Sequence, residues 1–295
     1  MKNIPYFHVD VFASQPFTGN SLAVFHEPTG LDAAQMLTVT QEMQHFETIF
    51  LEPTNKPDVK DARVFDLFEE LDFAGHPLLG AAAVLHHTNS FDEEQLWTFN
   101  LPQKTVTVRS RRRGDGYQCM LDQGTPEFLG QLGGSDIEEV CRALNLETAD
   151  IVEDLPLEVV STGLRYLIVP VRGALAKTRI VSSDFGELLK SFGAQFAYIL
   201  DVDLLEGRHW NNDGIQEDVA TGSAAGTVGA YLARHGRKPL NQEFTLKQGG
   251  YLGRPSEIRV RPIGTAGIVD RIQVGGDVAL VASCILLSEP KGGER

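Results

Sequence analysis

Short apolar runs with the alternation of half-buried strands recur along the whole chain. The predicted strands are residues 6–12, 21–25, 48–51, 62–68, 105–110, 117–121, 164–170, 196–200 and 258–262. Between some of them lie helix-like segments that follow a capping residue or a first-turn proline. The predicted helices are residues 33–43, 80–86, 137–144 and 187–192, opened by Asp32, Pro77, Ser135 and Asp184. Strands and helices do not alternate regularly, which predicts an α+β fold with mostly antiparallel strands.

Two glycine turns, each opening an Ala-rich helix, lie about half the 295-residue chain apart. One is Ala74-Gly75-His76-Pro77, and the other is Thr221-Gly222-Ser223-Ala224. The shared order of strand, sharp turn and small-residue helix predicts two similarly built domains, residues 1–123 and 124–277. The apolar tail, residues 278–288, is predicted to be a strand that returns to the first domain.

The composition is that of a globular protein, with 42% hydrophobic residues, 22% charged residues and a mean hydropathy of -0.13. A formal net charge of -14 repels phosphate backbones and anionic lipid head groups, so nucleic acid and membranes are not predicted partners. The apolar run at residues 278–287 is shorter than the roughly 18–20 residues of a membrane helix. Asp10 interrupts the N-terminus before the apolar core of a secretory signal, so a cytoplasmic location is predicted.

Cysteine, histidine and glycine spacing argues against several kinds of site. Three cysteines without a C-x-x-C pair fit neither a disulfide framework nor a thiolate metal site, and the histidines form no ligand cluster. We therefore predict no metal. Gly75 and Gly80 have the spacing of a phosphate-binding P-loop, but Ala81-Ala82 follow where Lys and Ser or Thr are required. A hydrolase nucleophile elbow and a dinucleotide fingerprint are also missing.

The two glycine turns are candidate anion sites, because a helix N-terminus presents backbone N–H groups at its positive end. His76 follows the first turn, where an imidazole can donate to a carboxylate or relay a proton. Ser223 holds the matching place in the second turn, and its hydroxyl can bind an anion or cap the helix. Asp218, preceded by Glu217, presents a carboxylate three residues before the second helix.

Glu47 is the candidate acid/base. It directly precedes an apolar strand that we expect to be buried. Desolvation there would raise its pKa from about 4.3 toward neutrality, as a proton shuttle at pH 7 requires. The alternative is a strand-edge glutamate that faces water.

In their order along the chain, these residues resemble the PhzF-like (phenazine-biosynthesis-type) isomerases, which are relatives of diaminopimelate epimerase. The resemblance covers most of the chain. The segments that carry it are Val9-Asp10-Val11-Phe12, Pro16-Phe17-Thr18-Gly19-Asn20, Glu47-Thr48, Phe73-Ala74-Gly75-His76-Pro77, Asp218, Ala220-Thr221-Gly222-Ser223-Ala224-Ala225-Gly226, Gln248-Gly249 and Gly253-Arg254-Pro255-Ser256.

The resemblance implies two pseudo-symmetric domains, each a curved, barrel-like sheet around a central helix, with the site in the interdomain cleft and commonly a homodimer. It also implies catalysis without metal or organic cofactor on a small carboxylate-bearing substrate, a dihydro-hydroxyanthranilate in the phenazine pathway. By the same resemblance Glu47 moves the proton, and His76 and Asp218 are the other catalytic residues. The residues that would bind substrate are Gly75, Gly222, Ser223, Asn20 and Thr221.

Departures from the family pattern bear on the reaction. The related epimerases use two thiols, and here Ala74 and Thr221 stand at those positions, which excludes a two-cysteine racemisation. A cofactor-independent isomerase with one carboxylate acid/base is the leading prediction. A thiol-independent racemase or epimerase that pairs Glu47 with His76 or Asp218 stays open, as does a non-catalytic small-acid binding protein.

Overall fold

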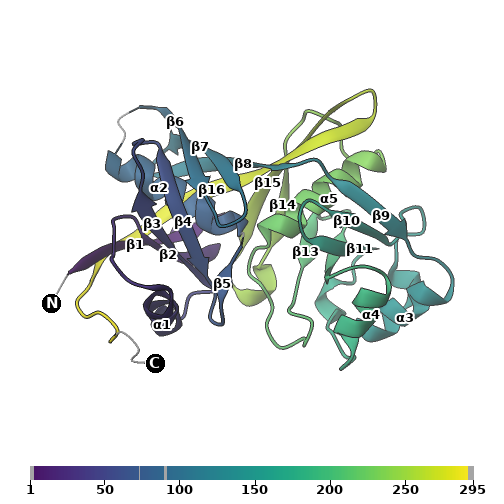
Figure 1. Cartoon of the computed structure of the whole chain (residues 1–295). Helices are drawn as coiled ribbons and strands as arrows, with labels where there is room; N and C mark the ends of the chain where they lie inside the picture. The colour runs from purple at the N-terminus through teal and green to yellow at the C-terminus, as the bar shows by residue number, and fades with distance from the viewer. Residues whose placement is uncertain (1–2, 73, 90–91, 292–295) are drawn as a thin grey trace. The chain divides into compact units, whose positions relative to one another are not determined.

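The computed structural model describes residues 3–72, 74–89 and 92–291. These residues form sixteen strands and five α-helices, and the chain divides into two compact units (Figure 1). The first unit is Met1–Asp122 with Gly275–Arg295, and the second unit is Gln123–Val274. Most of the strand pairs are antiparallel, so the predicted α+β class is confirmed. No helix among the described residues has both the length and the apolar character needed to cross a membrane.

Strands of the first unit follow one another around a closed ring. They are β1 (Ile4–Val11), β2 (Asn20–Phe25), β3 (Glu47–Pro53), β4 (Val59–Phe65), β6 (Glu94–Asn100), β7 (Thr105–Arg113), β8 (Gly116–Gly124) and β16 (Ile268–Leu286), while the short β5 (Glu70–Leu71) pairs with β4. Residues 268–274 of β16 belong to the second unit and its later residues to the first. Neighbours in this order are hydrogen-bonded, and β16 also pairs antiparallel with β1, which closes the ring.

Helix α2 (Gly75–Asn89) contacts β1, β2, β3, β6 and β7, and therefore lies inside the ring. All of its residues from His76 to His86 are buried. Gly80 allows the close approach, because a Cβ there would lie 2.4 Å from Leu22 Cδ2 and 3.1 Å from Val9 Cγ2. The small residues of this helix thus place its N-terminus deep against the sheet.

Helix α1 (Ala33–Met43) covers the outer face of the same sheet, where Met36 packs with Phe25 in a buried cluster. Asp32 accepts a hydrogen bond from Gln35 N at 2.9 Å, and Gln35 Oε1 accepts one from Asp32 N at 3.0 Å. This reciprocal capping box begins the helix at the residue that the sequence predicts.

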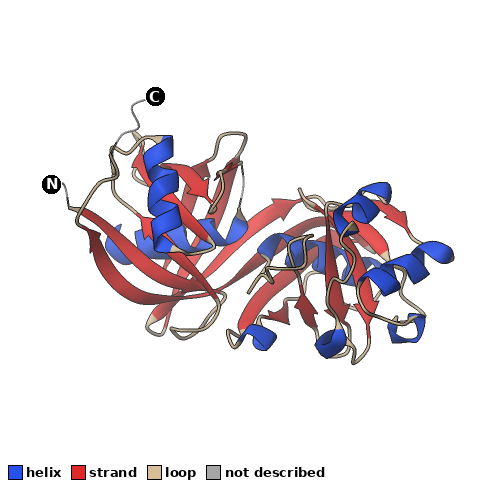
Figure 2. Ribbon diagram, turned by 90° about the horizontal axis from the view of Figure 1, so that it is seen from below, coloured by secondary structure: helices blue, strands red, loops and turns tan. Residues whose placement is uncertain are grey.

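The second unit repeats this order of elements. Its strands are β9 (Glu127–Gln131), β10 (Glu158–Ser161), β11 (Arg165–Val171), β12 (Phe196–Asp201), β13 (Glu206–Arg208), β14 (Phe244–Gln248) and β15 (Ser256–Thr265). Its helices are α3 (Ser135–Ala143), α4 (Phe185–Ser191) and α5 (Gly222–Arg234), with short 3-10 helices at Thr148–Asp150, Leu175–Lys177 and Gly250–Leu252. Figure 2 shows curved strands with helices against them in each unit.

Corresponding connections show that the two units are built alike. In the first unit α1 joins the parallel pair β2 and β3, and α2 joins the parallel pair β4 and β6. In the second unit α4 joins the parallel pair β11 and β12, and α5 joins the parallel pair β13 and β14. Helix α5 therefore corresponds to α2, as the two glycine turns predicted.

Strand β4 ends at Phe65, whereas the apolar pattern predicted a strand as far as residue 68. Asp66 causes the early end, because its Oδ1 accepts hydrogen bonds from the backbone N–H groups of Phe68 and Glu69, both at 2.7 Å. An aspartate that binds the backbone two and three residues ahead favours a turn over a strand.

Candidate active site

Glu47 and His76 form a close pair in the first unit. Glu47 is the first residue of β3 and lies beside Leu22 in the parallel pairing with β2. Paired residues of neighbouring strands point to the same face, so Glu47 points with Leu22 toward α2. His76, in the first turn of α2, has its Nδ1 3.1 Å from Glu47 Oε2. Both side chains are largely buried, with 15% of Glu47 and 8% of His76 exposed.

The chain enters β3 through a sharp turn at the end of α1. Gln44 adopts a left-handed conformation with φ 56°, and its N–H donates to Thr40 O at 3.2 Å, which ends the helix. This C-cap leaves only His45 and Phe46 between the helix end and Glu47. The base candidate is therefore fixed between a capped helix and a buried strand.

Asn20 lies near Glu47 on the same face of the sheet. It is the first residue of β2, is 2% exposed, and precedes Leu22 by two positions, so both side chains point to one side. Strand dimensions put the Asn20 and Glu47 backbones roughly 8 Å apart. Gly19, at φ 63°, makes the turn before Asn20 possible, since a Cβ there would lie 2.4 Å from Val11 O.

Gly75 begins α2, directly before His76. A Cβ at Gly75 would meet Leu121 Cδ2 at 3.8 Å, which is ordinary van der Waals contact. Packing within this unit therefore does not require glycine at this position. That its N–H binds substrate stays a prediction.

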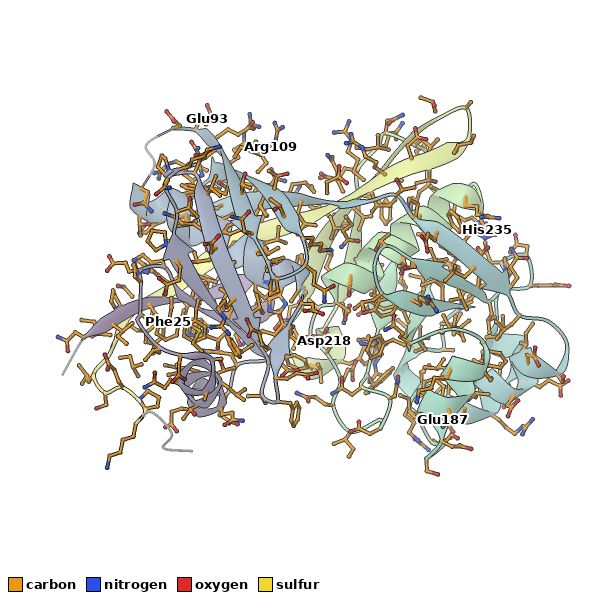
Figure 3. The ribbon with its side chains drawn as sticks, viewed as in Figure 1. Phe25, Glu93, Arg109, Glu187, Asp218 and His235 are labelled. Carbon is orange, nitrogen blue, oxygen red and sulfur yellow. The ribbon has the colours of Figure 1, made fainter. Side chains whose placement is uncertain are left out.

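Asp218 organises the loop before α5 in the second unit (Figure 3). Its Oδ2 accepts a hydrogen bond from Thr221 Oγ1 at 2.6 Å, and its Oδ1 accepts one from Ala220 N at 3.3 Å. Its own N–H donates to His209 O at 2.9 Å. Thr221, which is 7% exposed, thus orients the Asp218 carboxylate in addition to its predicted part in substrate binding.

Gln248 connects the parts of this loop and is a residue whose role the sequence did not reveal. Its Nε2 donates to Asp218 O and to Thr221 Oγ1, both at 2.9 Å. Its Oε1 accepts from Thr221 N and from Tyr198 Oη, both at 3.1 Å. The available signal was a polar residue that ends a strand just before Gly249.

Ser223, in the first turn of α5, is hydrogen-bonded to Tyr166, since its Oγ lies 2.8 Å from Tyr166 Oη. Tyr166 is 2% exposed and lies in the apolar strand β11, where its sequence context indicates only a core residue. The Ser223 hydroxyl is therefore bound to Tyr166 and does not cap its own helix. The N-cap residue of that helix, Thr221, forms no side-chain cap bond either. The orientation of the Ser223 hydroxyl therefore depends on Tyr166.

Glu217, next to Asp218, is a buried partner of Arg208 and not a solvated surface residue. Its carboxylate receives two hydrogen bonds from the Arg208 guanidinium, at 2.8 and 2.7 Å, and only 8% of its side chain is exposed. The guanidinium carbon lies 4.4 Å from the centre of the Trp210 ring and 4.5 Å from that of Tyr251. This arrangement anchors the strand that leads into the Asp218 loop.

The repeated architecture reveals an asymmetry. Phe196 begins β12 and pairs with Tyr166 as Glu47 begins β3 and pairs with Leu22. The position that corresponds to Glu47 therefore carries an apolar ring, which packs against Tyr166 and His209. Of the two corresponding positions, only the one in the first unit, Glu47, carries a carboxylate.

Of the predicted site residues, the structure brings Glu47 and His76 together in the first unit, and Asp218 and Thr221 in the second. Gly222 is buried at the start of α5, and its carbonyl accepts a hydrogen bond from Gln123 Nε2 at 2.9 Å. That the two sets act on one ligand stays a prediction. Among the described residues no group of three or more His, Cys, Asp or Glu side chains is arranged to hold a metal ion.

Comparison with known proteins shows the family of the chain. The family model for phenazine biosynthesis-like proteins (PhzC-PhzF) matches residues 9–284. The trans-2,3-dihydro-3-hydroxyanthranilate isomerase of Pseudomonas chlororaphis is 33% identical over 289 residues, covering 92% of this chain and 95% of that protein. The uncharacterized isomerase YddE of Escherichia coli O157:H7 is 32% identical over 266 residues, covering 86% of this chain and 88% of its own length. A predicted epimerase from Pseudomonas aeruginosa has a solved structure with TM-score 0.89 and 47% identity, covering 96% of this chain and 99% of that one.

The repeated α+β units and these matches define an isomerase with an epimerase-like fold. The chain belongs to the phenazine biosynthesis-like (PhzC-PhzF) family.

Proposed function

We propose that this isomerase moves one proton between two carbons of a small carboxylate-bearing, cyclic or unsaturated metabolite, with Glu47 as the single acid/base and without metal or organic cofactor. The substrate C–H bond breaks, and its proton passes to the Glu47 carboxylate. The electron pair shifts along the adjacent double bond, and Glu47 returns the proton to a second carbon. No other reactant is needed.

The observation that carries this proposal is the Glu47–His76 contact of 3.1 Å. A carboxylate that abstracts a proton needs a partner that keeps it oriented, and the imidazole does this from the first turn of α2. The apolar Phe196 at the corresponding position of the second unit favours one base over two. Ala74 and Thr221, at the thiol positions of related epimerases, favour the same conclusion.

The other predicted residues receive binding roles in this proposal. Ser223 and Asp218 hydrogen-bond the substrate, and the N–H groups at the starts of α2 and α5 stabilise negative charge on its carboxylate and on the developing anion. The relative from Pseudomonas chlororaphis acts on trans-2,3-dihydro-3-hydroxyanthranilate, a carboxylate of this class. This compound serves as the first probe.

Replacement of Glu47 tests the proposal. In Glu47→Gln the amide cannot accept the substrate proton, so turnover of the probe in deuterated water should fall by about 10²–10⁴-fold, along with deuterium incorporation. Product is measured by chromatography and deuterium by mass spectrometry. Binding of the probe should change little, because the amide keeps the size of the carboxylate.

Glu52→Gln is the matched control, since Glu52 lies in the same strand but points to the opposite face and should leave turnover unchanged. Undiminished exchange in Glu47→Gln would eliminate the proposed base. Inversion at a stereocentre of an amino or hydroxy acid, detected by chiral chromatography, would favour a racemase that uses His76 or Asp218 as second base.

A further inference from the structure

Phe17 is exposed and held in an unusual backbone conformation. Its side chain lies in the loop between β1 and β2, the residue is 76% exposed, and its φ is 69°. A left-handed conformation is unfavourable for a residue with a bulky side chain, and an exposed aromatic ring forgoes the free energy of burial. Backbone strain of this kind is retained where surrounding structure imposes it, often at ligand-binding sites.

Asp10 binds the backbone of Phe17. Asp10 lies in β1, is 1% exposed, and its Oδ2 accepts a hydrogen bond from Phe17 N at 2.6 Å. Its other oxygen, Oδ1, faces His8 Nε2 at 3.9 Å. A buried carboxylate thus binds the backbone of the residue whose ring is left in solvent.

Further contacts keep the loop rigid. Ala13 N donates to Asp277 O at 2.9 Å, and Thr18 Oγ1 donates to Gln15 O at 2.8 Å. Gly19 closes the loop where a Cβ would lie 2.7 Å from that of Ala13. The Phe17 ring is therefore presented by a fixed support.

This support lies at the edge of the sheet that carries Glu47. The loop follows Val11, the last residue of β1, and leads into Asn20, which pairs with Val11. Asn20 and Glu47 begin the parallel neighbours β2 and β3, so both strands start at one edge. His76 contacts Glu47 at the same edge.

We propose that Phe17 is a specificity-determining residue whose ring packs against the flat face of the bound substrate, and that Asp10 is the residue that positions it. The substrate class is then a carboxylate on a planar or nearly planar ring, in preference to an open-chain acid. This inference rests on the proposed function for the location of the substrate, and it adds the selection of cyclic substrates.

Binding of two non-reactive probes tests the inference. The cyclic probe is 3-hydroxyanthranilate and the open-chain probe is crotonate, both titrated calorimetrically into the full-length protein. Wild type should bind the cyclic probe more tightly. Phe17→Ala should weaken binding of the cyclic probe about tenfold and change that of crotonate less than twofold, whereas Phe17→Tyr should keep wild-type binding.

Leu96→Ala is the control, because Leu96 is 51% exposed in the same unit. Leu96 lies two residues before Thr98, which pairs with Val59 at the start of β4, whereas the other end of β4 pairs with Thr48 beside Glu47. Leu96→Ala should bind both probes as wild type does. Equal effects of Phe17→Ala and Leu96→Ala on the cyclic probe would overturn the inference.

The positioning role of Asp10 is tested by removing the oxygen that accepts the hydrogen bond from Phe17 N–H. Asp10→Ala removes the acceptor for Phe17 N–H and should raise KM for trans-2,3-dihydro-3-hydroxyanthranilate about tenfold with kcat within threefold. Asp10→Asn keeps an acceptor oxygen and should restore KM. A loss of kcat in both variants at unchanged KM would contradict a positioning role.

The outcomes separate this inference from the proposed function. Full turnover in Glu47→Gln with weakened ring binding in Phe17→Ala removes the proposed base and keeps the role of Phe17. Lost turnover in Glu47→Gln with wild-type binding in Phe17→Ala keeps the proposed base and removes the role of Phe17. Failure of the wild-type protein to prefer the cyclic probe also overturns the inference.

Discussion

At the scale of single residues, the Glu217–Arg208 pair illustrates why a charged residue in a polar sequence turn need not be on the surface. The Glu217 side chain is 8% and the Arg208 side chain 12% exposed. Arg208 Nη1 also donates to Leu175 O at 2.8 Å and to Thr178 O at 3.2 Å. The pair therefore binds the strand before the Asp218 loop to a neighbouring segment.

Breaking this pair should destabilise the protein strongly. Glu217→Ala leaves the Arg208 charge buried without its carboxylate, so the free energy of unfolding should fall by about 3 kcal/mol. Asp203→Ala is the control, since Asp203 pairs with Arg172 in an exposed ion pair, with 57% and 63% of the side chains exposed. That change should cost less than about 1 kcal/mol. Urea denaturation measures both, and equal losses would contradict the difference in burial.

At the scale of elements, the two central helices depend on glycine where they meet the sheet. In α5 a Cβ at Gly229 would lie 2.3 Å from Val260 Cγ1, and Val260 is fully buried. Valine is stiff at χ1, so it cannot move aside without disturbing its strand. The gain in helix propensity from glycine to alanine does not offset such overpacking.

Two glycine-to-alanine changes separate packing from propensity. Gly229→Ala should lower the free energy of unfolding by about 1–3 kcal/mol, because the new methyl group collides with Val260. In Gly186→Ala, in α4, the new Cβ would meet Asn212 Cβ at 3.6 Å and Asn212 Nδ2 at 3.7 Å, and the change should leave stability unchanged or raise it by up to about 1 kcal/mol. Thermal and urea unfolding of the two variants provide the measurement. A higher free energy of unfolding in Gly229→Ala would contradict this prediction, because it would mean that the strand of Val260 moves to make room for the methyl group.

Elements with a local cause were predictable from the sequence. Asp32 and its capping box begin α1, and the glycine turns begin α2 and α5. The strands β5, β6, β9, β10, β13 and β14 were not predicted, because they are short or mixed in polarity and owe their conformation to neighbouring strands. The predicted extension of β4 to residue 68 has a different origin, since it overlooked the local turn in which Asp66 binds the backbone ahead of it.

At the scale of the whole molecule, each unit contains a histidine that burial keeps neutral. Burial lowers the pKa of His209, while the nearby Asp218 carboxylate acts in the opposite direction. Burial likewise lowers the pKa of His26, against a smaller opposing effect of Glu27. Both histidines take up a proton more readily in the unfolded chain, near its ordinary pKa of about 6.5.

Stability should therefore be retained above about pH 6.5 and lost as the pH falls below it, since the unfolded state then binds more protons. Each histidine contributes at most about 1.4 kcal/mol per pH unit. Urea unfolding at pH 7.5, 6.5 and 5.5 measures the decline. His209→Gln should show a shallower decline than the wild-type protein, and parallel curves would contradict the assignment to His209.

The sequence by itself determined the α+β class, the repeat of two like units, the capped helix starts and the identity of the candidate side chains. These follow from local patterns: apolar alternation, capping residues and glycine turns act within a few positions of the chain. Only the tertiary structure decided which residues meet. The Glu47–His76 contact, the Tyr166–Ser223 and Gln248–Thr221 bonds and the burial of Glu217 join residues from 9 to 57 positions apart. Such contacts depend on strand register and helix packing, which local residue preferences do not specify.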